Sequence, residues 1–291
     1  MPDKAEQSTD KPSQPPVVRV VDLVKRFGDH TVLDGVNLDV QPGETMVIMG
    51  GSGCGKSTLL RQMIGTHWPN EGRVELFGRD LAAITAEELD AMRRRFGILY
   101  QSGALFNSMT VGENVALPLK EHTDLDSDTI DIMVRIKLEL VGLRPAVDKM
   151  PAEISGGMKK RAGLARAIAL DPEILFYDEP SAGLDPVTSA EIDQLMMDLS
   201  KKLGVTSVVV THEMDSAFRI ADRMAMLDKG RMLKVGPRAE FESIRDSAAT
   251  GEETGDLIRQ FLRGDSEGPI TRRRLDTDYE EDILEAAGRQ T

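Results

Sequence analysis

The sequence predicts an α/β fold that is interrupted by a block of helices, and two features of the 291-residue chain carry this prediction. First, a strand over 44–50, nearly all apolar past Thr45, runs into a glycine-rich turn and then a helix over 56–65. Apolar runs of this length bounded by turn residues are typical of buried strands. Second, strand patterns up to residue 101 and from residue 174 flank a stretch, 109–170, with the helical period.

The other elements follow in chain order. Residues 1–16 hold almost no apolar side chains, which predicts a disordered leader. Strands are expected at 17–24, 31–40, 73–77, 98–101, 174–177 and 207–210, and helices at 86–96, 127–141, 158–170 and 189–203. Thr110 and Glu113 have the spacing of a capping box, so a helix begins there. Asp228-Lys229-Gly230-Arg231 joins two strand-like runs, at 224–227 and 232–235, which predicts a β-hairpin.

The last part of the chain, 247–291, is expected to be a charged C-terminal extension. From residue 239 to the end there are 14 acidic residues and 7 arginines, a net charge of −7. Short helices are predicted at 256–262 and 279–287. A solvated tail is one interpretation of this composition, and a segment that wraps a partner subunit is the other.

Composition excludes several classes of protein. No run approaches the roughly 18–20 apolar residues that cross a bilayer, and the N-terminus does not resemble a secretory signal. A net charge of −13 with 4% aromatic residues argues against nucleic acid as a partner. The single cysteine, Cys54, suits a reducing compartment, so we expect a cytosolic protein.

The glycine-rich turn is a phosphate-binding motif. Gly50-Gly51-Ser52-Gly53-Cys54-Gly55-Lys56-Ser57 fits G-x-x-x-x-G-K-[ST] between a strand and a helix that continues with Thr58. Glycines let backbone N–H groups converge on phosphate oxygens at a helix N-terminus. Lys56 is predicted to reach the β- and γ-phosphates, and the Ser57 hydroxyl to ligate Mg²⁺.

Two further strands end in polar side chains that suit nucleotide hydrolysis. Asp178 and Glu179 end the apolar strand at 174–177. Beside a phosphate loop, Asp178 is expected to hold the Mg²⁺ shell and Glu179 to polarise the attacking water. His212 ends the strand at 207–211, where a contact to the γ-phosphate and a structural role are both open.

A second glycine motif identifies the kind of nucleotide hydrolase. Ser155-Gly156-Gly157 opens a helix about twenty residues before the Asp178 strand. In company with Gln101, Ser181-Ala182-Gly183-Leu184-Asp185 and His212, this set resembles the ATP-binding subunit of ABC transporters. Gln101 corresponds to that family's Q-loop, Asp185 to its D-loop and His212 to its switch histidine. The resemblance covers roughly 17–237.

This resemblance implies an architecture and a dimer. It implies a P-loop NTPase core with an antiparallel β subdomain in an ATP-binding domain over 17–246, with an inserted helical subdomain at about 105–170. It implies a head-to-tail homodimer in which the phosphate loop of one subunit and the Ser155-Gly156-Gly157 segment of the other enclose ATP. Gln101 is then a further Mg²⁺ contact, and Phe27 stacks on adenine or, alternatively, closes the core.

One departure from the family pattern points to a subfamily. Met158 stands where glutamine usually follows the two glycines, and a thioether cannot hydrogen-bond as an amide does. The segments 153–161, 101–106, 118–123 and 259–262 are similar to the ATPase of the Mla phospholipid-transport systems, which serve MCE-domain lipid carriers. The apolar triplet Ala104-Leu105-Phe106 is predicted either to pack locally or to form a groove for a cytoplasmic helix of the permease.

The resulting hypothesis is an ATPase that drives lipid transport across a bacterial envelope. Its expected partners are an integral-membrane permease, an MCE-domain protein and a small accessory protein, and the permease would hold it on the cytoplasmic face of the inner membrane. Rival hypotheses are the ATPase of an importer for a small solute such as an amino acid, and a soluble ABC ATPase without a transport role. His30, His67 and His122 lack metal-ligand grouping, so no zinc site is expected.

Overall fold

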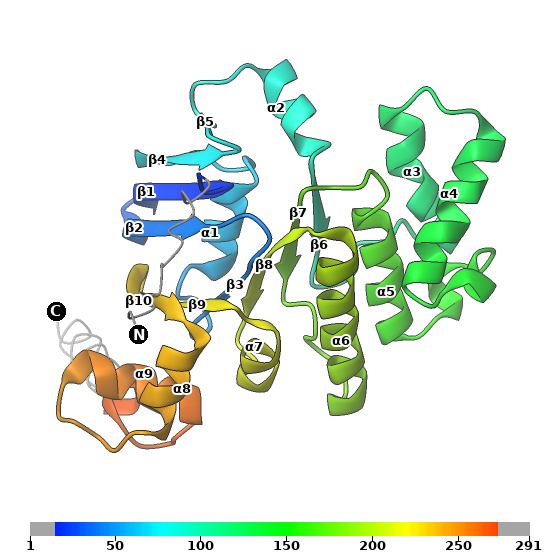
Figure 1. The fold of residues 1–291 in the computed structure, drawn as a ribbon. Helices are drawn as coiled ribbons and strands as arrows, with labels where there is room; N and C mark the ends of the chain where they lie inside the picture. The colour runs from blue at the N-terminus through cyan, green and yellow to red at the C-terminus, as the bar shows by residue number, and fades with distance from the viewer. Residues whose placement is uncertain (1–14, 273–291) are drawn as a thin grey trace, which may run out of the picture.

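The computed structural model describes residues 15–272, and a mixed six-stranded sheet lies at its centre (Figure 1). The strands run in the order β10-β9-β3-β8-β7-β6, all parallel except the edge strand β10. Their bounds are β3 Thr45–Met49, β6 Phe96–Leu99, β7 Ile174–Asp178, β8 Thr206–Thr211, β9 Arg223–Asp228 and β10 Arg231–Pro237. The predicted hairpin is the β9–β10 pair, with Lys229 and Gly230 both at positive φ in its turn.

A second, antiparallel sheet of four strands forms from the N-terminal part of the chain, in the order β2-β1-β4-β5. Its strands are β1 Val18–Phe27, β2 His30–Val40, β4 Glu71–Leu76 and β5 Arg79–Asp80. In the chain, helix α1 Lys56–Met63 comes before β4, and helix α2 Ala86–Arg93 comes after β5. The antiparallel subdomain that the family resemblance implied is therefore present.

The six-stranded sheet separates two hydrophobic cores, because successive side chains of a strand point to opposite faces. In β3, Met46 and Ile48 join the core shared with α1 and the antiparallel sheet. Val47 and Met49 join the other core, which the later helices cover. The continuous apolar run of this strand is thus explained by burial on both faces.

The central helices pack as a group beside the edge strand β6, at the right of Figure 1. They are α3 Val111–His122, α4 Ser127–Leu140 and α5 Gly156–Ala167, with short 3-10 turns at Arg144–Ala146 and Pro151–Glu153. The capping box predicted at Thr110 and Glu113 is confirmed, since each side chain bonds the other residue's backbone N–H. The Asp126 and Ser155 side chains cap α4 and α5 by accepting backbone N–H groups of the first turn.

The remaining helices include two that the sequence patterns did not indicate. These are α7 Met214–Ile220 and α8 Arg238–Asp246; the expected ones are α6 Pro186–Leu203 and α9 Glu253–Arg263. Both α8 and α9 bury apolar side chains, among them Phe241, Leu257 and Leu262, against the second core. Part of the acidic tail is therefore packed structure, whereas the helix predicted at 279–287 and the leader up to residue 14 lie outside the described residues.

Candidate functional site

The strand order brings the predicted catalytic residues together along one edge of the six-stranded sheet, the edge formed by the carboxyl ends of its parallel strands. Parallel strands end on the same side, and ligands of open α/β sheets bind beyond their carboxyl ends. The phosphate loop follows β3, His212 follows β8, Asp178 and Glu179 end β7, and Gln101 lies two residues beyond β6. Because β3, β8, β7 and β6 are consecutive neighbours, the four segments line up in that order.

The phosphate loop needs glycine at two positions for reasons of space as well as conformation. Gly50 has φ 155°, and a Cβ there would lie 2.1 Å from the carbonyl oxygen of Leu227. Gly55 has φ 109°, and its Cβ would meet Val32 O at 2.9 Å. Gly55 is the N-cap of α1 and offers no side-chain cap, so the first N–H groups of that helix are left for an anion.

Lys56 and Ser57 open α1 next to the end of β7. The Lys56 side chain is buried and its Nζ donates to the carbonyl oxygens of Gly50 at 2.8 Å and Gly51 at 3.0 Å. Ser57 Oγ donates to Asp178 Oδ1 at 3.2 Å. Burial raises the pKa of the Asp178 carboxyl, and the bond from Ser57 partly offsets this. Hydroxyl and carboxylate oxygens are ligands that Mg²⁺ prefers, so this pair fits that ion.

Glu179 and His212 form the second polar pair of the edge. Glu179 Oε2 lies 2.9 Å from His212 Nδ1 and accepts the His212 backbone N–H at 3.3 Å. The Glu179 side chain is 12% exposed and the His212 side chain 57% exposed. Glu179 also has φ 50°, in the left-handed region that non-glycine residues rarely adopt. Such positions concentrate at functional sites, where surrounding contacts hold them.

Lys160 is a member of this cluster that the sequence analysis did not identify. It lies on α5, is 4% exposed, and its Nζ donates to the backbone carbonyl of Glu179 at 2.9 Å. Burial lowers the pKa of Lys160 to about 8, although nearby Glu179 and Asp178 act in the opposite direction. A lysine in a predicted helix is usually solvent-exposed. The one feature of the sequence that could have indicated a role for Lys160 was its position five residues after Ser155.

Gln101 is exposed and begins a sharply bent segment. Gly103 and Ala104 have φ 74° and 49°, and Arg166 from α5 donates to both of their carbonyl oxygens, at 3.0 and 2.8 Å. Gly103 and Gly163 allow this segment to approach α5, because a Cβ on either would lie 2.9 Å from a backbone oxygen of the other segment. The loop after Gln101 is therefore attached to the helix that Ser155 opens.

Phe27 ends β1 with 48% of its surface exposed. His67 contacts its ring edge-on at 5.9 Å between centroids, and Lys25 Nζ lies 5.0 Å from the ring centre. An exposed ring held from one side leaves a face for a planar ligand. The alternative, that Phe27 closes the core, does not agree with this exposure.

Ser155-Gly156-Gly157 and Asp185 form a second cluster. Ser155 Oγ accepts the Met158 N–H at 3.3 Å as the cap of α5. Asp185 caps α6 and accepts the N–H groups of Val187 and Thr188. A Cβ on Gly157 would lie 2.6 Å from Thr188 Cγ2, so the two helix starts are adjacent. The candidate residues of the sequence analysis thus fall into these two clusters, apart from Phe27, which ends β1 in the antiparallel sheet.

The thiol of Cys54 is buried in the phosphate loop and burial raises its pKa. Its thiolate fraction at neutral pH is therefore low. A small, unreactive side chain is therefore sufficient at position 54 of the phosphate loop.

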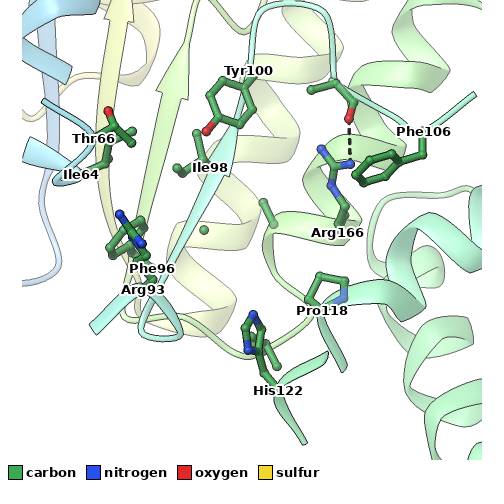
Figure 2. Close-up of a pocket in the computed structure, with 14 residues that line it drawn as sticks. Ile64, Thr66, Arg93, Phe96, Ile98, Tyr100, Phe106, Pro118, His122 and Arg166 are labelled. Atoms are coloured by element: carbon green, nitrogen blue, oxygen red, sulfur yellow. Dashed lines mark hydrogen bonds between the residues drawn. The ribbon is translucent and has the colours of Figure 1, made fainter. Parts of the chain in front are cut away.

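A groove opens beside the bent segment after Gln101 (Figure 2). It encloses about 520 Å³, and Figure 2 shows Phe106, Arg166, Tyr100, Pro118 and His122 along its walls. Of the predicted apolar triplet, Ala104 and Phe106 are exposed, Phe106 to 50%, whereas Leu105 packs against the core, so the triplet both packs locally and reaches the surface. Among the described residues that line the groove, Arg93, Arg166 and His122 carry basic groups and none is acidic.

Comparison with known proteins identifies relatives across most of the chain. The family model for the ABC transporter matches residues 33–182. A protein of Mycobacterium leprae named "Probable ribonucleotide transport ATP-binding protein mkl" is 43% identical over 253 residues, covering 87% of this chain and 70% of its own length. The intermembrane phospholipid transport ATP-binding protein MlaF of Haemophilus influenzae is 38% identical over 269 residues, covering 92% of this chain and 98% of its own. MlaF of Escherichia coli K12 is 40% identical over 257 residues, covering 88% and 92%.

Solved structures with the same fold are ATP-binding cassettes. The ATP-binding cassette MJ0796, a dimer in a post-hydrolysis state with ADP and phosphate, aligns with TM-score 0.70 and 30% identity over 76% of this chain and 98% of its own. CbiO1 of Clostridium perfringens, part of the transporter complex cbiONQ, aligns with TM-score 0.73 and 29% identity over 84% and 99%. Within residues 15–272, no helix has the length and apolar character that a membrane span requires.

Proposed function

The chain belongs to the ABC transporter family, and we propose that it is the ATP-hydrolysing subunit that drives phospholipid transport through a separate permease. The observation that carries the hydrolytic part is the sheet edge, where Lys56, Ser57, Asp178, Glu179 and His212 follow neighbouring strands. These groups supply what phosphoryl transfer to water requires, namely phosphate binding, a metal site and a base.

The proposed hydrolysis assigns a residue to each step of the reaction. The N-terminus of α1 and the Lys56 side chain bind the phosphates. To do so, Lys56 Nζ leaves the carbonyl oxygens of Gly50 and Gly51 and donates to phosphate oxygens instead. Mg²⁺ held by Ser57 and Asp178, with Gln101, would neutralise charge on the β- and γ-phosphates. Glu179 takes a proton from water as the water oxygen bonds to the γ-phosphorus and the bond to the ADP oxygen breaks. His212 fixes the orientation of the Glu179 carboxylate and contacts the γ-phosphate.

The second cluster requires another copy of the chain in this scheme. Ser155-Gly156-Gly157 starts α5 with free N–H groups, which suits a phosphate. In a head-to-tail homodimer this segment would cover ATP bound to the partner's phosphate loop, with Asp185 beside it. The similarity to MJ0796, whose structure is a dimer with ADP and phosphate, supports this arrangement.

The groove in Figure 2 is the proposed contact to the permease. It lies against the segment after Gln101, so a helix seated there would touch the part of the chain that reaches toward the bound nucleotide. The permease would hold the chain on the cytoplasmic face of the inner membrane. An MCE-domain lipid carrier and a small accessory protein would complete the complex.

The names of the relatives support two substrate classes. Identity is slightly higher to mkl, whose name specifies ribonucleotide transport. MlaF of Haemophilus influenzae matches nearly end to end, whereas 30% of mkl lies outside the alignment. Phospholipid is therefore the first candidate and a soluble, phosphate-bearing solute such as a ribonucleotide is the second.

Recovery of the complex from membranes distinguishes these candidates. Tagged Glu179→Gln protein with ATP and Mg²⁺ is purified from detergent-solubilised membranes, and co-purifying proteins and lipids are identified by mass spectrometry. A multi-span permease with an MCE-domain protein and phospholipid supports the first candidate. A permease with a soluble solute-binding protein and no MCE partner supports the second. Absence of any membrane partner contradicts both.

A further inference from the structure

Asp193 is a buried carboxylate to which the scheme above gives no role. It lies in the middle of α6, and its side chain has 0% exposure. Oδ1 accepts a hydrogen bond from Ser216 Oγ at 2.5 Å, and Oδ2 accepts one from Arg219 NH1 at 2.5 Å. Both donors lie on α7, so these two bonds join α6 to α7. A buried carboxylate is tolerated only when it is paired in this way.

The two helices joined by Asp193 carry two residues of the site. Asp185 is the cap of α6, eight residues or about 12 Å before Asp193 along the helix axis. His212 lies two residues before the first residue of α7 and four before Ser216. Asp193 therefore links the loop of the second cluster to the residue that orients Glu179.

Apolar packing between the two helices is concentrated beyond their starts, where Ala217 and Ile220 of α7 join the same core as Ile192 of α6. Leu184, Pro186 and Ser189 face Glu213 and Met214 across an open hollow of about 360 Å³. In addition, α7 has only seven residues and its N-cap Glu213 makes no side-chain cap bond. A helix this short has little stability of its own. Together with the core contacts of Ala217 and Ile220, the two bonds to Asp193 therefore fix the position of α7 relative to α6.

We propose that Asp193 is a positioning residue that holds α7 on α6, so that His212 and Glu179 keep a fixed place relative to Asp185. A shift of the Asp185 loop, as when a second copy docks on it, is then carried through α6, Asp193 and α7 to His212. A buried ion pair adds little net stability compared with apolar packing, so its value here is the geometry that it fixes. The inference rests on the proposed roles of Glu179 and His212.

Steady-state kinetics of the full-length chain tests this role. Asp193→Asn keeps the shape and one acceptor but loses the charge that pairs with Arg219. We expect kcat for ATP hydrolysis to fall about 10- to 100-fold, since a misplacement near 1 Å costs that much. KM for ATP should stay within about twofold, because the phosphate loop is untouched. Arg219→Met leaves the buried Asp193 carboxylate without its charge partner, so it should lower kcat in the same direction and also lower the Tm.

A matched control separates positioning from stability. Lys137→Met breaks another ion pair that has one buried partner, since the Lys137 side chain is 7% exposed and that of Asp171 is 65% exposed. Lys137 Nζ contacts Asp171 Oδ1 at 2.5 Å between α4 and the turn after α5. We expect Lys137→Met to lower the Tm while kcat remains that of the wild type. Hydrogen exchange of the amides at 212–217 should become faster in Asp193→Asn and remain unchanged in Lys137→Met.

The result that overturns the proposal is a wild-type kcat in Asp193→Asn, or unchanged exchange at 212–217 in that variant. Equal loss of kcat in Lys137→Met also overturns it, because loss of any ion pair with a buried partner would then have the same effect. These outcomes all presuppose a wild-type chain that hydrolyses ATP. A wild-type chain without ATPase activity would instead refute the proposed function, and the positioning role with it.

Discussion

The backbone of Glu179 explains how one carboxylate is aimed at the site from the end of a buried strand. Its φ of 50° turns the chain out of β7, while its N–H donates to Val210 O at 2.9 Å and its carbonyl accepts from Lys160. A left-handed non-glycine residue costs about 1–3 kcal/mol, which these contacts offset. The side chain then meets His212.

Glu179→Gln should remove the base and preserve the shape. We expect kcat to fall at least about 100-fold, in line with the loss of a general base, while ATP binding persists and ATP-filled dimers accumulate. Gel filtration with ATP and Mg²⁺ measures the dimer, and phosphate release measures kcat. Hydrolysis at the wild-type rate would show that another group takes the proton.

Lys56→Ala should act on binding. Hydrogen bonds to charged groups contribute about 1.5–3 kcal/mol, so Kd for ATP should rise roughly 30-fold. Titration with a fluorescent ATP analogue measures this constant, and Lys202→Ala, at the far end of α6, serves as the control. An unchanged Kd would contradict the role of Lys56.

The lowered pKa of Lys160 predicts that the free energy of unfolding depends on pH. Its pKa of about 8 in the folded chain lies below the usual 10.5, so between these pH values the unfolded chain binds the extra proton. The free energy of unfolding should therefore rise with pH across this window, relative to Lys160→Met, which has no such group. Urea unfolding at pH 7.5, 8.5 and 9.5 measures the difference, and a constant difference would contradict the lowered pKa.

At the scale of elements, helix α5 connects the parts of the site. It begins at Ser155, contributes Lys160 to the Glu179 turn, and holds the loop after Gln101 through Gly163 and Arg166. The groove also touches this helix at Arg166 and Ala167. A rotation of α5 would therefore reach the groove, the bent loop and the Ser155 cap together.

Gly163→Ala tests the contact between α5 and that loop. Alanine favours a helix by about 1 kcal/mol over glycine, but a Cβ at 163 would lie 2.9 Å from Gly103 O. We expect a net loss of roughly 1–3 kcal/mol in the free energy of unfolding. Gly255→Ala in α9 is the control, because its Cβ meets only the flexible end of Glu252 at 3.2 Å. The control should gain stability, and a gain in both variants would contradict the close approach.

The sequence predicted those elements whose pattern is local. The strands that end at the site, the phosphate loop and the capped helices all follow from apolar runs, glycines and caps. In contrast, α7 is too short to show a helical period, and α8 buries a single residue, Phe241, within a charged stretch. Lys160 and Asp193 also gave no signal, because their role depends on contacts with residues 19 to 26 positions away.

At the scale of the whole molecule, the proposed function makes the chain one subunit of a larger assembly. The chain carries a net charge of −13, yet its groove is lined by basic and aromatic side chains. In the proposed scheme the two clusters of site residues are likewise incomplete alone, since the phosphate loop would hold ATP on one side and the Ser155-Gly156-Gly157 segment of a second copy on the other. The central claim is that two copies complete each other's site head to tail.

Mixing two inactive variants tests this claim most directly. Lys56→Ala lacks a working phosphate loop, and Ser155→Arg lacks a working Ser155 cap, so each homodimer has no intact site. A mixed dimer has one intact site, made from the phosphate loop of the second variant and the Ser155 segment of the first. We predict that an equal mixture regains ATPase activity, up to about one quarter of the wild-type rate for random pairing. No recovery at any mixing ratio would contradict the head-to-tail site.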